Sequence, residues 1–306
     1  GEEPGGELVG VCLGRALVEI RDFTPQAISN TLWAHARLGL PLPPELKEAL
    51  TAQALERSAL FNHQEVANSL GALVKLGEAP GRALLAALIA RAAQTVDSSS
   101  PQDLARLLWA LARLGEAPPW GLMEKVKARA YAKMRSFNPQ NVANLLWAFA
   151  TLQEAPGEAL LEALRARACA QMHAFNPQDI SNLLWAFTVL GEPPGRELLD
   201  AVRHRALATM PETREQGLTN TVWAFAKLAE SPGPQLLDAI RERGSALGSS
   251  LSPQDVANTL WAFATLGEQP LGLLSVLRAR AVEMVHLFNP QDIANILWAF
   301  ATLGEA

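Results

Sequence analysis

One pattern of apolar and polar positions recurs along the whole chain. In the copy that follows Asn138, the apolar residues are spaced by three and four, which is typical of a helix with one buried face. They are Val142, Leu145, Leu146, Phe149 and Leu152. Asn138 is a good N-cap, and Pro139 suits the first helical position, where a missing N–H costs nothing. The pattern predicts a helix, here called helix A, that begins at Pro139.

Other copies carry start and stop signals for the same helix. Acidic residues, which favour the positive end of the helix dipole, stand at the third helical position at Glu65, Asp103, Asp179, Asp255 and Asp292. Glycines that can stop a helix follow at Gly191, Gly267 and Gly304. After a short turn, a second periodic stretch extends from about Glu158 to about His173, with Leu160, Leu161, Leu164, Ala168 and Met172 on one side. This stretch is predicted to be helix B.

A glutamine marks the same position in every copy. The glutamines are Gln26, Gln64, Gln102, Gln140, Gln178, Gln216, Gln254 and Gln291, with six intervals of 38 residues and a last interval of 37. Two helices and two short loops fill one period, so no strand fits between them. We therefore predict an all-α fold, an α-solenoid of eight antiparallel helix pairs that forms one domain over residues 1–306.

The ends of the array lead to two further expectations. Residues 2–5, Glu-Glu-Pro-Gly, match the turn at residues 154–157, so we expect no targeting segment in this chain. The array begins and ends inside a repeat without the polar outer face of a capping repeat. We expect a segment of a longer protein, or ends that neighbouring subunits cover.

Two columns of large polar or aromatic residues lie on helix A. The tryptophans are Trp33, Trp109, Trp147, Trp185, Trp223, Trp261 and Trp298, with Gly71 as the exception. The asparagines are Asn30, Asn68, Asn144, Asn182, Asn220, Asn258 and Asn295, with Arg106 as the exception. The tryptophans are predicted to be structural side chains, buried in the groove between repeats, while base stacking is the alternative. The asparagines form either a buried amide ladder between repeats or, as the sharper hypothesis, base contacts at Asn144, Asn182, Asn220, Asn258 and Asn295.

Two columns of basic residues lie on helix B. The first is Arg15, Gln53, Arg91, Arg129, Arg167, Arg205, Arg243 and Arg280, and the second becomes basic toward the C-terminus at Lys127, Arg165, Arg203, Arg241 and Arg278. One cation per repeat is what a tracked RNA backbone needs, so these arginines are candidates for phosphate contacts. The alternative is pairing with a glutamate column after helix A, which is Glu78, Glu116, Glu154, Glu192, Glu230, Glu268 and Glu305.

With these motifs, the array resembles the octotricopeptide repeat family of organellar proteins. The resemblance covers essentially the whole chain and rests on the 38-residue period, on segments such as Ala143-Asn144-Leu145-Leu146-Trp147-Ala148, and on Pro118-Pro119-Trp120. It implies an α-solenoid that binds single-stranded RNA in a chloroplast or mitochondrion and acts in transcript stability, processing, splicing or translation. Relatives in that family also serve as structural subunits of organellar ribosomes.

Charge and composition narrow the possible functions. The net charge of −5 argues against a wholly basic nucleic-acid binder, although a total does not say how charge is distributed. The five histidines occupy different repeat positions, and no metal-ligand spacing, phosphate-binding loop or nucleophile elbow is present. No apolar run is long enough to span a bilayer. We expect no catalysis, no cofactor, no metal and no small-molecule substrate.

Two functions follow from these observations. The first is a non-enzymatic organellar protein that binds single-stranded RNA. The second is a scaffold subunit that contacts other proteins in a ribosome or in a photosynthetic or respiratory complex. The position five residues after the marker glutamine is often apolar, as at Leu107, Leu145, Leu183 and Ile296. This bias favours the scaffold function, because such residues offer little chemical variety for reading bases.

Overall fold

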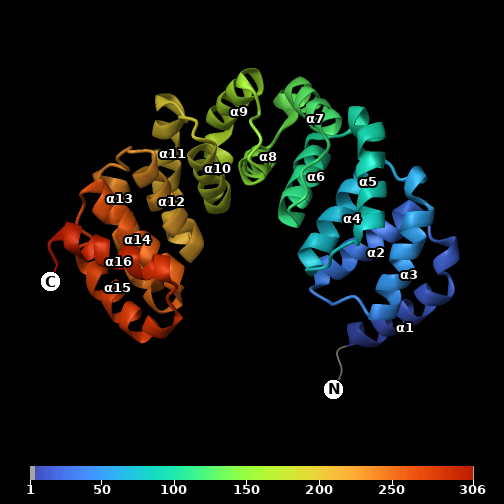
Figure 1. Cartoon of the computed structure of the whole chain (residues 1–306), viewed down its shortest axis with the longest axis horizontal. Helices are drawn as coiled ribbons and strands as arrows, with labels where there is room; N and C mark the ends of the chain where they lie inside the picture. Colours follow the sequence, from blue (N-terminus) through green and yellow to red (C-terminus); the bar gives the residue numbers. More distant parts are fainter. Residues whose placement is uncertain (1–3, 306) are drawn as a thin grey trace. The chain divides into compact units, whose positions relative to one another are not determined.

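The computed structural model describes residues 4–305, which form α-helices and short 3₁₀ helices without any strand (Figure 1). The α-helices are α1 (Pro4–Val18), α2 (Pro25–Leu38), α3 (Pro44–Glu56), α4 (His63–Leu76), α5 (Arg82–Thr95), α6 (Pro101–Leu114), α7 (Trp120–Lys133), α8 (Pro139–Leu152), α9 (Glu158–Gln171), α10 (Pro177–Leu190), α11 (Arg196–Thr209), α12 (Glu215–Lys227), α13 (Pro234–Leu247), α14 (Pro253–Leu266), α15 (Gly272–Glu283) and α16 (Pro290–Leu303). The predicted all-α class is confirmed. Of the turn expected at residues 2–5, residues 2 and 3 lie outside the described part.

A 3₁₀ turn that the sequence did not predict follows each B helix. These turns are η1 (Ile20–Asp22), η2 (Ser58–Leu60), η3 (Val96–Ser98), η4 (Met134–Ser136), η5 (Met172–Ala174), η6 (Met210–Glu212), η7 (Gly248–Ser250) and η8 (Val285–Leu287). The residue after each turn has an extended backbone, as Phe175 does with φ −67° and ψ 133°. The chain therefore tightens and then reverses direction before the next A helix.

The A helices begin with the predicted caps. Asn138 accepts a hydrogen bond from the backbone N–H of Asn141, and the Asn141 side chain accepts one from the backbone N–H of Asn138. The same capping box stands at the start of α4, α6, α10, α14 and α16. Helix α12 is different, because Arg214 is its N-cap and forms no side-chain cap bond. Such boxes satisfy backbone donors that a helix cannot pair within itself.

The described residues group into two compact units, which are divided between Phe137 and Asn138. In each unit, the even-numbered A helices pack side by side along their length, and the odd-numbered B helices form a second layer on one side of them. The largest buried side chains of the A helices in the second unit are Phe149, Phe187, Phe225 and Phe263. These rings occupy the core between the two layers. A membrane-spanning helix is not found in the described part of the chain.

Candidate functional site

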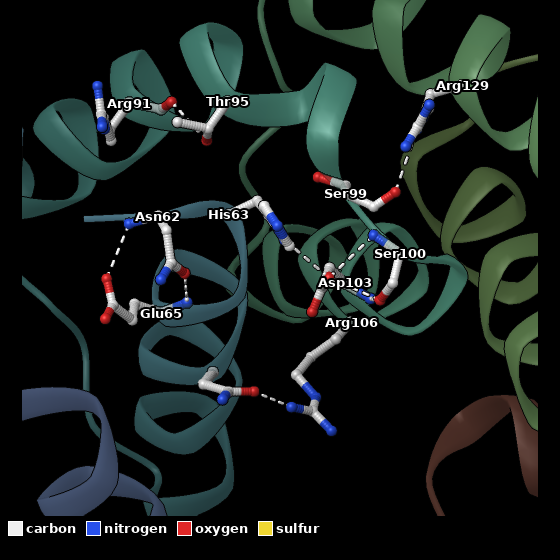
Figure 2. A network of polar contacts seen from close by, with 11 residues as sticks. Asn62, His63, Glu65, Arg91, Thr95, Ser99, Ser100, Asp103, Arg106 and Arg129 are labelled. Carbon is white, nitrogen blue, oxygen red and sulfur yellow. Dashed lines mark hydrogen bonds and ion pairs between the residues drawn. The ribbon is translucent and has the colours of Figure 1, made fainter. Parts of the chain in front are cut away.

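The first arginine column on the B helices binds the loop of the preceding repeat. The Nε–H groups of Arg129, Arg205 and Arg243 donate to the backbone carbonyls of Ser99, Phe175 and Thr213 over 3.1, 2.7 and 2.8 Å. Arg91 and Arg280 make the same bond to Phe61 and Leu251, and Gln53 makes it to Phe23. Each acceptor directly follows a 3₁₀ turn, where a carbonyl has no helical partner. The period of this column thus has a structural reason (Figure 2, Arg129 and Ser99).

The first column has two further members, Arg15 and Arg167. Arg15 of α1 forms an ion pair with Glu19, which directly follows that helix, and Arg167 stands at the equivalent position on α9. As contacts to an RNA backbone, the members of this column remain a prediction.

The second arginine column joins each B helix to the turn of the following repeat. Arg203 pairs with Asp200 at 2.7 Å and with Glu230 at 3.1 Å, donates to the carbonyl of Ser231 at 2.9 Å, and lies 5.6 Å from the centroid of the Phe225 ring. Arg165, Arg241 and Arg278 likewise pair with Glu192, Glu268 and Glu305 and lie over Phe187, Phe263 and Phe300. Pairing with the glutamate column, the alternative to RNA contact, is therefore present for the four arginines of this second column, whereas Lys127 pairs with Glu124 on its own helix.

The tryptophan column lies between repeats but is not part of the buried core. The rings of Trp147 and Trp185 stack with centroids 6.0 Å apart, and those of Trp261 and Trp298 lie 6.4 Å apart. Trp33 and Trp298 are 50% and 47% exposed, and the other tryptophans of the column are partly exposed. The expectation of contact between repeats is confirmed for these pairs, whereas the expectation of full burial is wrong. The buried ring is the phenylalanine two residues later, on the opposite side of the helix.

One side of each A helix carries the positions of the glutamine, asparagine and tryptophan columns, together with a fourth position. In α8 these are Gln140, Asn144, Trp147 and Thr151, whose spacing of four, three and four places them on one face. Gln140 is exposed and the other three are partly exposed. We call the surface formed by these four positions in each repeat the A face. It is the side of the A layer opposite the B helices, because Phe149 and Leu145 on the other sides are buried.

Most amides of the A face are not used by the protein. Among the described residues, the side chains of Asn144, Asn182, Asn220 and Asn258 make no hydrogen bond, and their polar atoms are not buried. The expected amide ladder between repeats is therefore wrong at these positions. The partial exposure of these amides lets water, or a ligand, take the place of a protein partner. By contrast, Asn295 accepts a bond of 2.8 Å from Gln291.

The A face is basic although the chain as a whole is acidic. Its positions carry five basic residues and no acidic one, against a net charge of −5 for the chain. The basic residues are Arg37, Lys75, Arg106, Arg113 and Lys227. Arg37, Lys75 and Arg113 stand 38 residues apart at the fourth position, are exposed, and form no ion pair within the described residues. Sequence reasoning missed this column, although its period was visible.

The two exceptions to the columns compensate each other. Arg106, which replaces an asparagine, extends from α6 to the side-chain oxygen of Asn68 on α4 (Figure 2). A Cβ at Gly71, which replaces a tryptophan, would lie only 3.0 Å from Cγ and Cδ of Arg106. The missing ring thus makes room for the arginine. Partial burial, the larger effect, lowers the pKa of Arg106, while Asp103 opposes this shift.

A second polar link of the first unit involves a histidine. Nδ1 of His63, which stands where most other repeats have proline, lies 2.9 Å from Oδ2 of Asp103 (Figure 2). Asp103 also accepts bonds from the backbone and hydroxyl of Ser100. This carboxylate therefore joins two repeats and caps α6 at the same time.

The family model of the RNA-editing substrate-binding complex 6 protein matches this chain over residues 6–157 and over residues 81–305. The two matches overlap and together cover nearly the whole chain. No curated protein matches the chain. The resemblance to the octotricopeptide repeat family has no support from this match and stays a prediction.

Proposed function

We propose that this chain, which belongs to the RNA-editing substrate-binding complex 6 family, is a non-enzymatic component of an RNA-editing assembly and binds single-stranded RNA along its A face. The observation that carries the proposal is the composition of this face. It repeats an aromatic ring and an amide, adds basic residues, and contains no acid. Proteins that bind single strands combine a positive surface with aromatic rings on which bases stack.

Each group of the A face has a distinct role in this proposal. Arg37, Lys75 and Arg113 supply one exposed cation per repeat and contact phosphates. The amides of Asn144 and Asn182, which no protein group occupies, donate to and accept from base edges. The role that sequence reasoning gave to the B-helix arginines passes to these residues, because the guanidinium groups on helix B already bind carbonyls and carboxylates of the protein.

The family also bears on where the protein works. The octotricopeptide resemblance implies a chloroplast or a mitochondrion. We propose the mitochondrion, because the matched family is named for an RNA-editing complex. The chloroplast alternative gains no support from this match.

Binding of a labelled single-stranded RNA, measured by fluorescence anisotropy over a range of salt concentrations, tests the proposal. Replacement of Arg37, Lys75 and Arg113 by glutamate removes three phosphate contacts. The slope of log K against log salt should then fall by about two, since each single-strand contact contributes about 0.7. Unchanged affinity and slope would overturn the assignment of RNA to the A face.

A matched control makes the same change in charge elsewhere. Arg82, Lys133 and Arg135 are exposed residues of α5, α7 and η4. Their replacement by glutamate should alter the salt slope much less, because non-specific attraction falls off within about one Debye length. Equal losses for both triple variants would mean that only the total charge matters.

A scaffold role is the second candidate, and one observation favours it. Trp120 and Tyr131 on α7, in the B layer, are 81% and 56% exposed. They are eleven residues apart, so they share one side of the helix. Exposed aromatic side chains are enriched at protein interfaces. Replacement of both by alanine should reduce capture of protein partners and leave RNA affinity unchanged; loss of RNA binding alone would argue against this role.

A further inference from the structure

The tryptophan column of residues 138–306 contains three kinds of step between neighbouring repeats. Two steps are closed, since the rings of Trp147 and Trp185 stack on each other and those of Trp261 and Trp298 lie tilted against each other, with centroids 6.4 Å apart. The step between Trp223 and Trp261 holds a lysine. The Nζ atom of Lys227 lies 5.8 Å from the centroid of Trp223 and 4.6 Å from that of Trp261. Among the described residues, Trp185 and Trp223 contact neither each other nor a cation between them.

Ring separation decides which of these steps can admit another ring. A flat ring stacked between two others needs about 3.5 Å on each side, so its two neighbours must be about 7 Å apart. The centroids of Trp147 and Trp185 are 6.0 Å apart, which is too close. Lys227 already occupies the step after Trp223. Of the steps between described residues of the second unit, only that between Trp185 and Trp223 is both free of ring contact and free of a side chain that bridges the rings.

The side chains around the open step differ from those of the other steps. The fourth A-face position there is Val189, which is 41% exposed, whereas the other repeats carry threonine, lysine or arginine. An exposed valine adds apolar surface and no charge beside the two indoles. Asn182 and Asn220, one turn before each tryptophan, have amides that make no hydrogen bond to the described part of the protein.

We infer that the step between Trp185 and Trp223 is a slot for one unpaired nucleobase. The base stacks between the two indole rings, Val189 covers apolar ring surface, and the amides of Asn182 and Asn220 bond its polar edge. An apolar side chain of a protein partner would leave both amides without a partner, which favours a base. This inference rests on the proposed binding of single-stranded RNA, and it adds the position at which a base is held.

Affinities of four short homopolymeric RNAs, with adenine, cytosine, guanine or uracil as the base, test the slot. Trp185→Leu and Trp223→Leu each remove one wall. Trp120→Leu is the matched control, because this exposed indole lies on α7 in the B layer, outside the A face. We expect each wall variant to lose affinity about tenfold or more, in line with the loss of one stacked base, and the control to lose less than about twofold. Asn220→Ala should reduce the difference in affinity among the four RNAs.

A variant that fills the slot tests the inference without the removal of a large ring. Val189→Lys places a lysine where Lys227 stands in the next repeat. It should fill the slot and abolish ultraviolet crosslinking of 4-thiouridine RNA to peptides that contain Trp185 or Trp223. The unfolding midpoint of each variant is measured beside its affinity, so a folding defect is separated from a binding defect.

The possible outcomes separate the slot from the proposed function. If the native protein binds none of the RNAs, the proposed function fails and the slot fails with it. If the native protein binds RNA but Trp185→Leu loses no more affinity than Trp120→Leu, or Val189→Lys crosslinks as before, the slot is wrong and the proposed function stands. If a wall variant has lost its fold, the result with Val189→Lys decides.

Discussion

At the scale of single residues, the contact between Gly71 and Arg106 shows how a repeat array tolerates exceptions. Arg106 occupies the space next to the missing indole and bonds Asn68. Trp33 is 50% exposed because the next repeat offers it no ring at Gly71. The two departures from the pattern, Gly71 and Arg106, therefore belong to a single packing arrangement. Neither could be interpreted from the sequence, because the relation between them is a contact across repeats.

A double-mutant cycle tests this arrangement. Gly71→Trp alone forces an indole against the Arg106 side chain, and overpacking of this kind costs about 1–3 kcal/mol. Gly71→Trp combined with Arg106→Asn restores both columns and should recover most of that loss. Free energies of unfolding from urea titrations give the coupling energy. Additive effects of the two changes would show that the residues are independent.

At the scale of elements, the sequence predicted both ends of helix A, with stops at Gly191, Gly267 and Gly304, but only the start of helix B. Helix A was expected to begin at Pro139, and α8 begins there, because the cap signals are local. Helix B was expected to continue to about His173, but α9 ends at Gln171 and a 3₁₀ turn follows. Met172 begins the 3₁₀ turn and is buried. A buried apolar residue fits an α-helix and a 3₁₀ turn equally well, so the apolar pattern could not reveal the change of helix type.

The candidate site was predicted only in part, for a related reason. Periodicity identified the tryptophan, asparagine and arginine columns, but not which side of the layers each column faces. The buried ring proved to be Phe187 instead of Trp185, since both are large apolar residues of one helix. The arginines bind loop carbonyls whose proximity depends on how repeats stack. A helical pattern cannot supply that distance.

The N-terminus of α10 carries a prediction about pH. Asp179 at its third position is 5% exposed; burial, the larger effect, raises its pKa, and the bond from the Asn176 backbone opposes this. Between the ordinary value near 4 and the raised value, the folded state therefore binds more protons than the unfolded state. The contribution of Asp179 to the free energy of unfolding should therefore rise as the pH falls through that window, and it should be lowest at pH values above the window.

The variant Asp179→Asn isolates this effect from the other carboxylates. Asn141 already forms the same capping box in α8, so the amide should preserve the fold. The native protein should gain stability relative to this variant as the pH is lowered from 7 toward 4, measured by urea unfolding at each pH. A difference between the two proteins that stays constant, or changes in the opposite direction, would contradict the raised pKa.

At the scale of the whole molecule, acidic and basic residues are distributed unequally between surfaces. The chain carries 26 basic and 31 acidic residues, yet the A face has no acid. Arginines of the B layer instead pair with acids or bind carbonyls, as Arg203 and Arg205 do. Net charge alone therefore does not exclude a ligand that is a polyanion. We expect stability and RNA binding to depend on different sets of cations.

Arg205 and Arg243 test this division within the second unit. Their bonds to the carbonyls of Phe175 and Thr213 involve a charged donor, which contributes about 1.5–3 kcal/mol. Arg205→Ala and Arg243→Ala should each lower the free energy of unfolding by about that amount, while glutamine at either position should retain part of it, because Gln53 makes the equivalent bond to Phe23. RNA affinity at moderate salt should change little in all four variants. If instead RNA binding is lost while stability is kept, these arginines contact phosphates after all, and the proposed RNA surface moves from the A face to the B helices.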